Sequence, residues 1–98
     1  MQQVAQAQSH TVIHRGDPAF EKTCIAPRGK QRVVKINYCD DHPEIYTILG
    51  DKNSLEEARH LLREYWNDKD MANCCTIRIF DSGGEKIWDS AKEATYYL

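Results

Sequence analysis

The strongest hydrophobic pattern in the chain lies in residues 53–67, NSLEEARHLLREYWN. Apolar residues recur there at the spacing of one helical face, and charged residues cover the opposite face. The apolar stripe consists of Leu55, Ala58, Leu61, Leu62, Tyr65 and Trp66. Ser54 and Glu57 have the spacing of a capping box, which satisfies the first backbone N–H groups of a helix. The sequence therefore predicts an amphipathic helix that must bury one side against another element.

Shorter segments on both sides of this helix carry the pattern of β-strands. They are rich in β-branched and aromatic residues and are bounded by turn-forming residues. These segments are residues 32–39, 44–49, 74–80 and 85–89. The turn at 81–84, DSGG, is a strong hairpin signal because glycine takes positive φ at no steric cost. The order predicts an α+β fold: a small antiparallel sheet with a ββαββ core and one amphipathic helix packed on one face.

The two ends of the chain carry weaker signals. Residues 1–10, MQQVAQAQSH, are polar and rich in glutamine, which predicts a flexible, disordered N-terminal tail. Residues 11–13 fit a brief edge strand, and residues 19–26 fit another short strand. Residues 90–98 combine a capping box with a strand-like ending, so helix and strand both stay open. We expect residues 11–98 to form a single α+β domain.

The alternation along the strands predicts which side chains share a face of the sheet. The face that meets the helix is expected to hold Val34, Ile36, Cys75, Ile77, Ile79 and Ile87. The second face is expected to hold Val33, Phe80 and Trp88 beside Lys35, Thr76, Arg78 and Lys86. The strand at 44–49 is apolar at both parities, so its orientation stays open.

Composition and charge restrict the classes of protein. A chain of 98 residues builds one modest core and has little room for a cleft between subdomains. The net charge of −2 implies no strong overall attraction to nucleic acid or to acidic membranes. No apolar run approaches the roughly 20 residues of a membrane-spanning helix, and residues 1–10 lack the hydrophobic stretch of a signal peptide. We therefore expect a cytoplasmic protein with reduced cysteines.

The cysteines do not follow a metal-binding pattern. Zinc sites use closely spaced pairs, because a short loop between two ligands can wrap one ion. Cys24 and Cys39 stand alone, while Cys74 and Cys75 are adjacent in a predicted strand and point to opposite faces. We interpret all of them as small buried hydrophobic residues, and we expect neither a metal nor another cofactor.

No catalytic residues can be assigned. The segment 40–44, DDHPE, offers carboxylates and an imidazole, which suit a hard cation or acid–base work. Aspartate and proline also favour turns, and no partner cluster of carboxylates is identifiable. The chain contains neither a nucleophile elbow nor a glycine-rich phosphate loop. We expect a protein that is not an enzyme, with a small metal-binding protein as a minor alternative.

The candidate binding residues belong to the second sheet face. They are the aromatic residues Trp88, Phe80 and Tyr46 with the basic residues Arg78, Lys86 and Lys35. Aromatic residues and arginine are enriched in protein interfaces. The favoured hypothesis is therefore a small binding module of the adaptor, regulator or inhibitor type, which contacts a partner protein or forms a homodimer. A nucleic-acid-binding module is the alternative, because rings stack on bases while cations meet phosphates.

A third interpretation makes this face part of the interior. Residues 11–30 or 91–98 would then cover it, and Trp88 would be internal. In that case the interface is expected on the charged surface of the helix, which carries Glu56, Arg59, Arg63 and Glu64.

Overall fold

The computed structural model describes residues 11–14, 16–38, 44–66 and 75–96. Its strands are β1 (Thr11–His14), β2 (Gln31–Asn37), β3 (Ile45–Lys52), β4 (Cys75–Phe80) and β5 (Lys86–Asp89). Its helices are the 3₁₀ turn η1 (Phe20–Lys22), α2 (Leu55–Trp66) and α4 (Ser90–Tyr96). The predicted tail at residues 1–10 lies outside the described residues.

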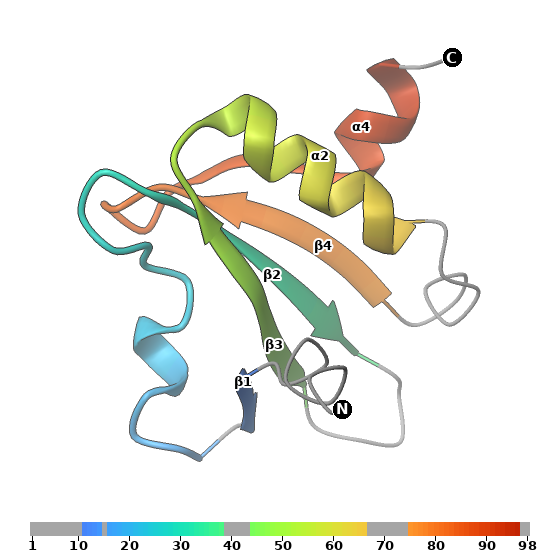
Figure 1. Ribbon diagram of the computed structural model, residues 1–98. Coiled ribbons are helices and arrows are strands. Elements are labelled where there is room, and N and C mark those ends of the chain that lie inside the picture. The colour runs from blue at the N-terminus through green and yellow to red at the C-terminus, as the bar shows by residue number, and fades with distance from the viewer. Residues whose placement is uncertain (1–10, 15, 39–43, 67–74, 97–98) are drawn as a thin grey trace, which may run out of the picture.

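The strands form one antiparallel sheet in the order β1-β3-β2-β4-β5. Helix α2 lies across one face of this sheet, and α4 lies beside α2 (Figure 1). The predicted α+β class, with an antiparallel sheet and one amphipathic helix on one face, is confirmed. The brief edge strand expected at residues 11–13 is present as β1, and the C-terminal segment, for which helix and strand were both open, forms the short helix α4.

The capping box at the start of α2 has the predicted geometry. The Glu57 backbone N–H donates to Ser54 Oγ at 3.1 Å, and the Asn53 N–H donates to Glu57 Oε1 at 3.2 Å. The side chain at the start of the turn thus accepts a hydrogen bond from the backbone at its end, and the side chain at its end accepts one from the backbone at its start. This reciprocal pair fixes the point at which the chain leaves β3 and enters α2.

Residues 19–26 do not form the predicted strand. They contain η1 and turns, in which Thr23 Oγ1 donates to the Ala19 carbonyl at 3.0 Å. The segment packs onto the sheet face opposite α2, where the Phe20 ring stacks on Tyr46 with centroids 4.4 Å apart. Its apolar residues therefore pack on the face of the sheet opposite α2, and the segment does not pair with an edge of the sheet.

The sheet separates two hydrophobic clusters. The cluster under α2 consists of Val33, Leu49, Ala58, Leu62, Ile77 and Ile79. The smaller cluster on the opposite face consists of Val34, Ile36 and Phe80, with Cys24 and Tyr46 packed against it. Both faces of the central strands are thus covered, which explains why β2 and β4 are apolar at consecutive positions.

The predicted faces are right for β4 but wrong for β2. Cys75, Ile77, Ile79 and Ile87 pack toward α2 as expected. Val34 and Ile36 instead lie on the opposite face, and Val33 lies under α2. The reason is that Val33 is paired with Ile79, so the register of β4 decides which of two adjacent valines meets the helix.

Trp88 is also on the opposite side from its prediction. The pairing of β4 with β5 shifts between Ile79, which faces Trp88, and Phe80, which faces Lys86. This irregularity leaves Ile87 as an extra residue, and Ile87 and Trp88 both pack against the cluster under α2. A bulge of this kind reverses the face of every residue beyond it, and the sequence contains no clear signal for it.

The C-terminal helix α4 is held by a buried carboxylate. Glu93 is 3% exposed, and its oxygens accept hydrogen bonds from Arg59 Nε at 2.8 Å, Arg63 Nη1 at 3.1 Å and Trp88 Nε1 at 2.7 Å. The start of α4 is also tied to the sheet, because the Ile77 N–H donates to the buried Ser90 Oγ at 3.2 Å. Together these bonds join α4 to α2, β4 and β5.

The pKa of Glu93 lies below its ordinary value near 4.5. Burial on its own would raise this pKa, but the hydrogen bonds from Arg59, Trp88 and Arg63 outweigh it. A carboxylate with a lowered folded-state pKa contributes stability that is complete above its unfolded pKa. This contribution is lost as the pH falls through the lower, folded-state pKa.

We predict that Leu62→Ala lowers the free energy of unfolding by about 2–5 kcal/mol, because it leaves a cavity where a fully buried side chain packed. Glu56→Gln, on the exposed side of the same helix, should change it by less than about 0.5 kcal/mol. Denaturant-induced unfolding measures both. Equal, small losses would contradict the burial of α2 against the sheet.

We predict that Glu93→Gln lowers the free energy of unfolding at pH 7 by about 1–3 kcal/mol, because hydrogen bonds from charged groups to a buried carboxylate are lost. The difference from the unmodified protein should narrow as the pH is lowered from 5 to 3. Unfolding in urea across this pH range measures it, with Glu85→Gln on the exposed turn before β5 as the control. If the difference in unfolding free energy between the two proteins did not change with pH, the ionised carboxylate of Glu93 would not be its cause.

Candidate functional site

The structure divides the predicted binding residues between the two faces of the sheet. Those on the face opposite α2 are Phe80, Tyr46, Arg78 and Lys86. Lys35 and Trp88 lie on the α2 face instead. Lys35 is opposite Ile77 of β4, and Trp88 is opposite Ile79 of the same strand. The predicted placement of Lys35 and Trp88 with the others is therefore wrong.

The aromatic residues on the face opposite α2 are covered by the chain itself. Phe80 is buried, and Tyr46 lies under the ring of Phe20. The covering segment is fastened by Arg32 Nη1, which donates to the Thr23 carbonyl at 3.3 Å. Residues 19–26 thus make this part of the face internal, as the third interpretation of the sequence anticipated. The aromatic residues do not form an open platform on which bases could stack.

Trp88 is occupied by contacts within the molecule. The guanidinium of Arg59 lies 4.3 Å from the centre of its ring, and the ammonium of Lys92 lies 4.8 Å from it. Its indole N–H donates to Glu93. A half-buried ring held between two cations and a carboxylate serves to anchor α4. Replacing it would disturb the fold as well as any surface nearby.

The basic residues on the face opposite α2 remain near the surface. Arg78 is exposed and is paired across the strands with Asp89. Lys86 Nζ donates to Asp89 Oδ2 at 2.9 Å. Lys86 is therefore bound to Asp89 and Arg78 lies near the same carboxylate, which leaves a patch of mixed charge at the end of the sheet.

The described residues contain no cluster of metal-binding side chains. Among them, no group of three or more histidine, cysteine, aspartate or glutamate side chains could hold a metal ion. Burial raises the pKa of the Cys24 thiol, although Arg78 and Arg32 partly oppose this, so its reactive thiolate is disfavoured. Residues 40–43 of the acidic segment lie outside the described residues, as do Cys39 and Cys74, so the predicted burial of these two cysteines stays a prediction.

A second feature of the sheet was not foreseen from the sequence. The described part of β1 pairs with Ile45–Ile48, whereas β3 continues through Lys52. Within the described part of the chain, no strand pairs with the outer edge of residues 49–52. Alternate residues of an edge strand direct their N–H and C=O groups outward, so this segment can accept another strand.

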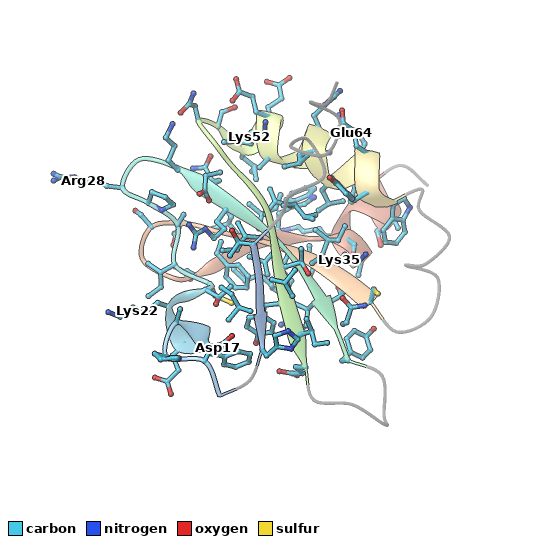
Figure 2. The ribbon with its side chains drawn as sticks, turned by 60° about the horizontal axis from the view of Figure 1, so that its bottom comes forward. Asp17, Lys22, Arg28, Lys35, Lys52 and Glu64 are labelled. Carbon is cyan, nitrogen blue, oxygen red and sulfur yellow. The ribbon has the colours of Figure 1, made fainter. Side chains whose placement is uncertain are left out.

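A hollow lies where this free edge meets α2. It has a volume of about 410 Å³ and is lined by Lys52, Glu57, His60, Leu61 and Glu64. We call the outer edge of residues 49–52 together with these lining residues the edge groove. Figure 2 shows Lys52 and Glu64 on the α2 side of the molecule, far from Asp17 and Lys22 of the N-terminal segment.

Gly50 brings α2 close to the edge of the sheet. A Cβ atom at this position would lie 2.9 Å from Leu61 Cδ2, so the leucine side chain rests directly over the glycine. Leu61 is therefore the apolar floor of the edge groove, and the polar lining residues form its rim. The absence of a side chain at Gly50 makes this close approach of helix and strand feasible.

The two flanks of α2 carry opposite charge. Glu57 and Glu64 line the edge groove, with His60 Nδ1 at 3.5 Å from Glu64 Oε2. On the other flank, Arg59 and Arg63 are bound to the buried Glu93. The single carboxylate of Glu93 thus offsets part of the charge of the basic flank, while the acidic flank faces the groove.

The second hollow among the described residues is less suited to binding. It has a volume of about 460 Å³ and is lined by Gly16, Asp17, Pro18, Phe20 and Glu21. Asp17 Oδ2 accepts from the His14 N–H at 2.8 Å, and the Asp17 N–H donates to the His14 carbonyl at 3.0 Å. These groups close the turn after β1, and the Phe20 ring is stacked on Tyr46.

The sequence contains only part of the signal for the edge groove. The Gly50-Asp51 pair indicates a stop, so the strand was predicted to end at Leu49. The structure continues it because Arg32 lies opposite Asp51, with its Nε donating to Asp51 Oδ1 at 2.8 Å and its Nη2 to Oδ2 at 3.1 Å. This pairing across strands depends on the register, which the alternation alone does not fix.

Comparisons with known proteins do not assign a family. No helix in the described part of the chain is long and apolar enough to cross a membrane. No protein-family model matches the sequence, and no match was found among curated proteins or among solved structures.

Proposed function

We propose that this protein is a small, non-enzymatic binding module that takes up an extended segment of a partner protein in the edge groove. The observation that carries the proposal is the extension of β3 past the described part of β1, alongside α2. Among the described residues, a strand edge without a pairing partner and a hollow lined by side chains therefore occur at the same place.

Strand addition uses both parts of such a site. An incoming strand forms main-chain hydrogen bonds with the free edge, and these supply affinity for any extended chain. Its side chains alternate between the two faces of the sheet. Those on the α2 side would enter the hollow and contact Leu61, which supplies selectivity for sequence.

At the C-terminal end of β1, the sheet edge is closed by hydrogen bonds within the chain. The N–H and C=O groups of His14 are both bonded to Asp17, which blocks the outward backbone groups at that point. No comparable closure occurs along residues 49–52 within the described chain. This difference supports a role for the β3 edge in binding.

The same edge also provides for self-association. A second copy could present its own residues 49–52 antiparallel to the first, which gives a two-fold symmetric contact. The nucleic-acid alternative has no comparable support, since Phe80 and Tyr46 are covered and Trp88 lies on the other face.

We predict that peptides selected from a random display library against the full chain bind by strand addition. On titration, the backbone amide NMR signals of residues 49–52 and of the groove flank of α2 should shift. N-methylation of two peptide amides that face β3 should weaken binding at least about tenfold, because two hydrogen bonds are lost. N-methylation of the alternate amides, which face solvent, is the control and should have little effect.

Two results would contradict the proposal. One is the absence of any selected peptide that shifts the signals of residues 49–52. The other is equal weakening by both patterns of N-methylation, which would exclude a strand-like pairing. Light scattering on the free protein gives its molar mass and so distinguishes a monomer from a dimer. A dimer formed through this edge would cover the amides of residues 49–52 without any peptide.

A further inference from the structure

We infer that the segment taken up in the edge groove is basic, with lysine or arginine on both sides of a small apolar residue along its α2-facing side. This inference rests on the proposed function and deepens it by naming the chemistry of the ligand. It follows from the charge of the groove and from the spacing of the residues along α2.

The charges of α2 are segregated before any ligand binds. Arg59 and Arg63 each contact the carboxylate of Glu93, at 2.8 Å and 3.1 Å, so the basic side chains of α2 lie on the flank away from the groove. The flank along the groove carries Glu57 and Glu64, both exposed. An excess of negative charge on one side of a shallow groove attracts positively charged ligands.

The spacing of these residues suggests the pattern of the ligand. Glu57 and Glu64 are separated by about 10 Å along the helix axis, at 1.5 Å per residue. Leu61 lies between them on the same flank. In an extended strand, side chains on one face recur every two residues, or about 6.7 Å. Three successive facing residues therefore match the order basic, apolar, basic, with flexible lysine or arginine side chains reaching inward to the two glutamates.

Lys52 gives the groove a direction. It lines the end where β3 passes into α2, near Glu57, and partly offsets the negative charge there. Among the described lining residues, the Glu64 end has no basic residue except His60, whose Nδ1 lies 3.5 Å from Glu64 Oε2. The stronger attraction for a ligand cation is therefore at the Glu64 end, and this makes Glu64 the residue to test.

The test uses two fluorescein-labelled nonapeptides and the full chain. Both peptides have valine at the central α2-facing position and threonine at the positions facing the other way. One carries lysine at the two flanking α2-facing positions, and the other carries glutamate there. Affinities are measured by fluorescence anisotropy for the unmodified protein, for Glu64→Lys in the groove and for Glu56→Lys, a matched charge reversal on the same helix that does not line the groove.

We expect the lysine peptide to bind the unmodified protein about three- to tenfold more tightly than the glutamate peptide, as is typical of exposed ion pairs. Glu64→Lys should abolish or reverse this preference, while Glu56→Lys should retain it. The preference should shrink between 50 mM and 500 mM salt, because screening acts on exposed charges. Circular dichroism of both variants checks that the fold is unchanged.

The outcomes separate this inference from the proposed function. Equal or tighter binding of the glutamate peptide overturns the basic ligand, and strand addition stands if the amides of residues 49–52 still shift. The same conclusion follows if neither peptide binds while library-selected peptides do map to the edge groove. If Glu56→Lys removes the preference as fully as Glu64→Lys, the attraction is a general charge effect and the assignment to the groove is wrong.

Discussion

The register of β2 against β4 is the constraint on which the arrangement of this domain depends. Val33 is opposite Ile79, and both are completely buried under α2. The same register puts Val34 on the other face, beneath the segment that contains η1. A shift of one residue between β2 and β4 would exchange the two clusters. The separate pairing of β2 with β3 sets Arg32 opposite Asp51, and the ion pair between them holds β3 beside β2 as far as Lys52.

Helix α2 links the interior of the domain to its candidate binding surface. One flank is tied through Glu93 to α4 and Trp88, so the helix cannot roll on the sheet without breaking several charge-assisted hydrogen bonds. The other flank stands at a fixed height above the free edge of β3. The contacts that hold α2 rigidly therefore lie on the flank opposite the edge groove, which suits the proposed binding of a ligand there.

The sequence predicts the elements better than it predicts their faces. The stripe from Leu55 to Trp66 and its capping box identify α2 almost to the residue, because helix periodicity and capping are local properties. Val33 and Val34 are equally apolar, and only their partners on β4 distinguish them. Trp88 is placed by a bulge in the β4–β5 pairing. The edge groove needs the end of β1, the end of β3 and the flank of α2 together, and none of these alone identifies it.

The contact between Gly50 and Leu61 makes the depth of the edge groove adjustable through one position. The Cβ of a larger residue at Gly50 would press on the end of a flexible leucine side chain, so Leu61 could move aside while the backbone edge kept its course. The floor would rise, yet the hydrogen-bonding groups of β3 would stay in place. If the proposed strand addition holds, variants at this position would bind the same backbone but accept side chains of different size, so specificity could change without a new fold.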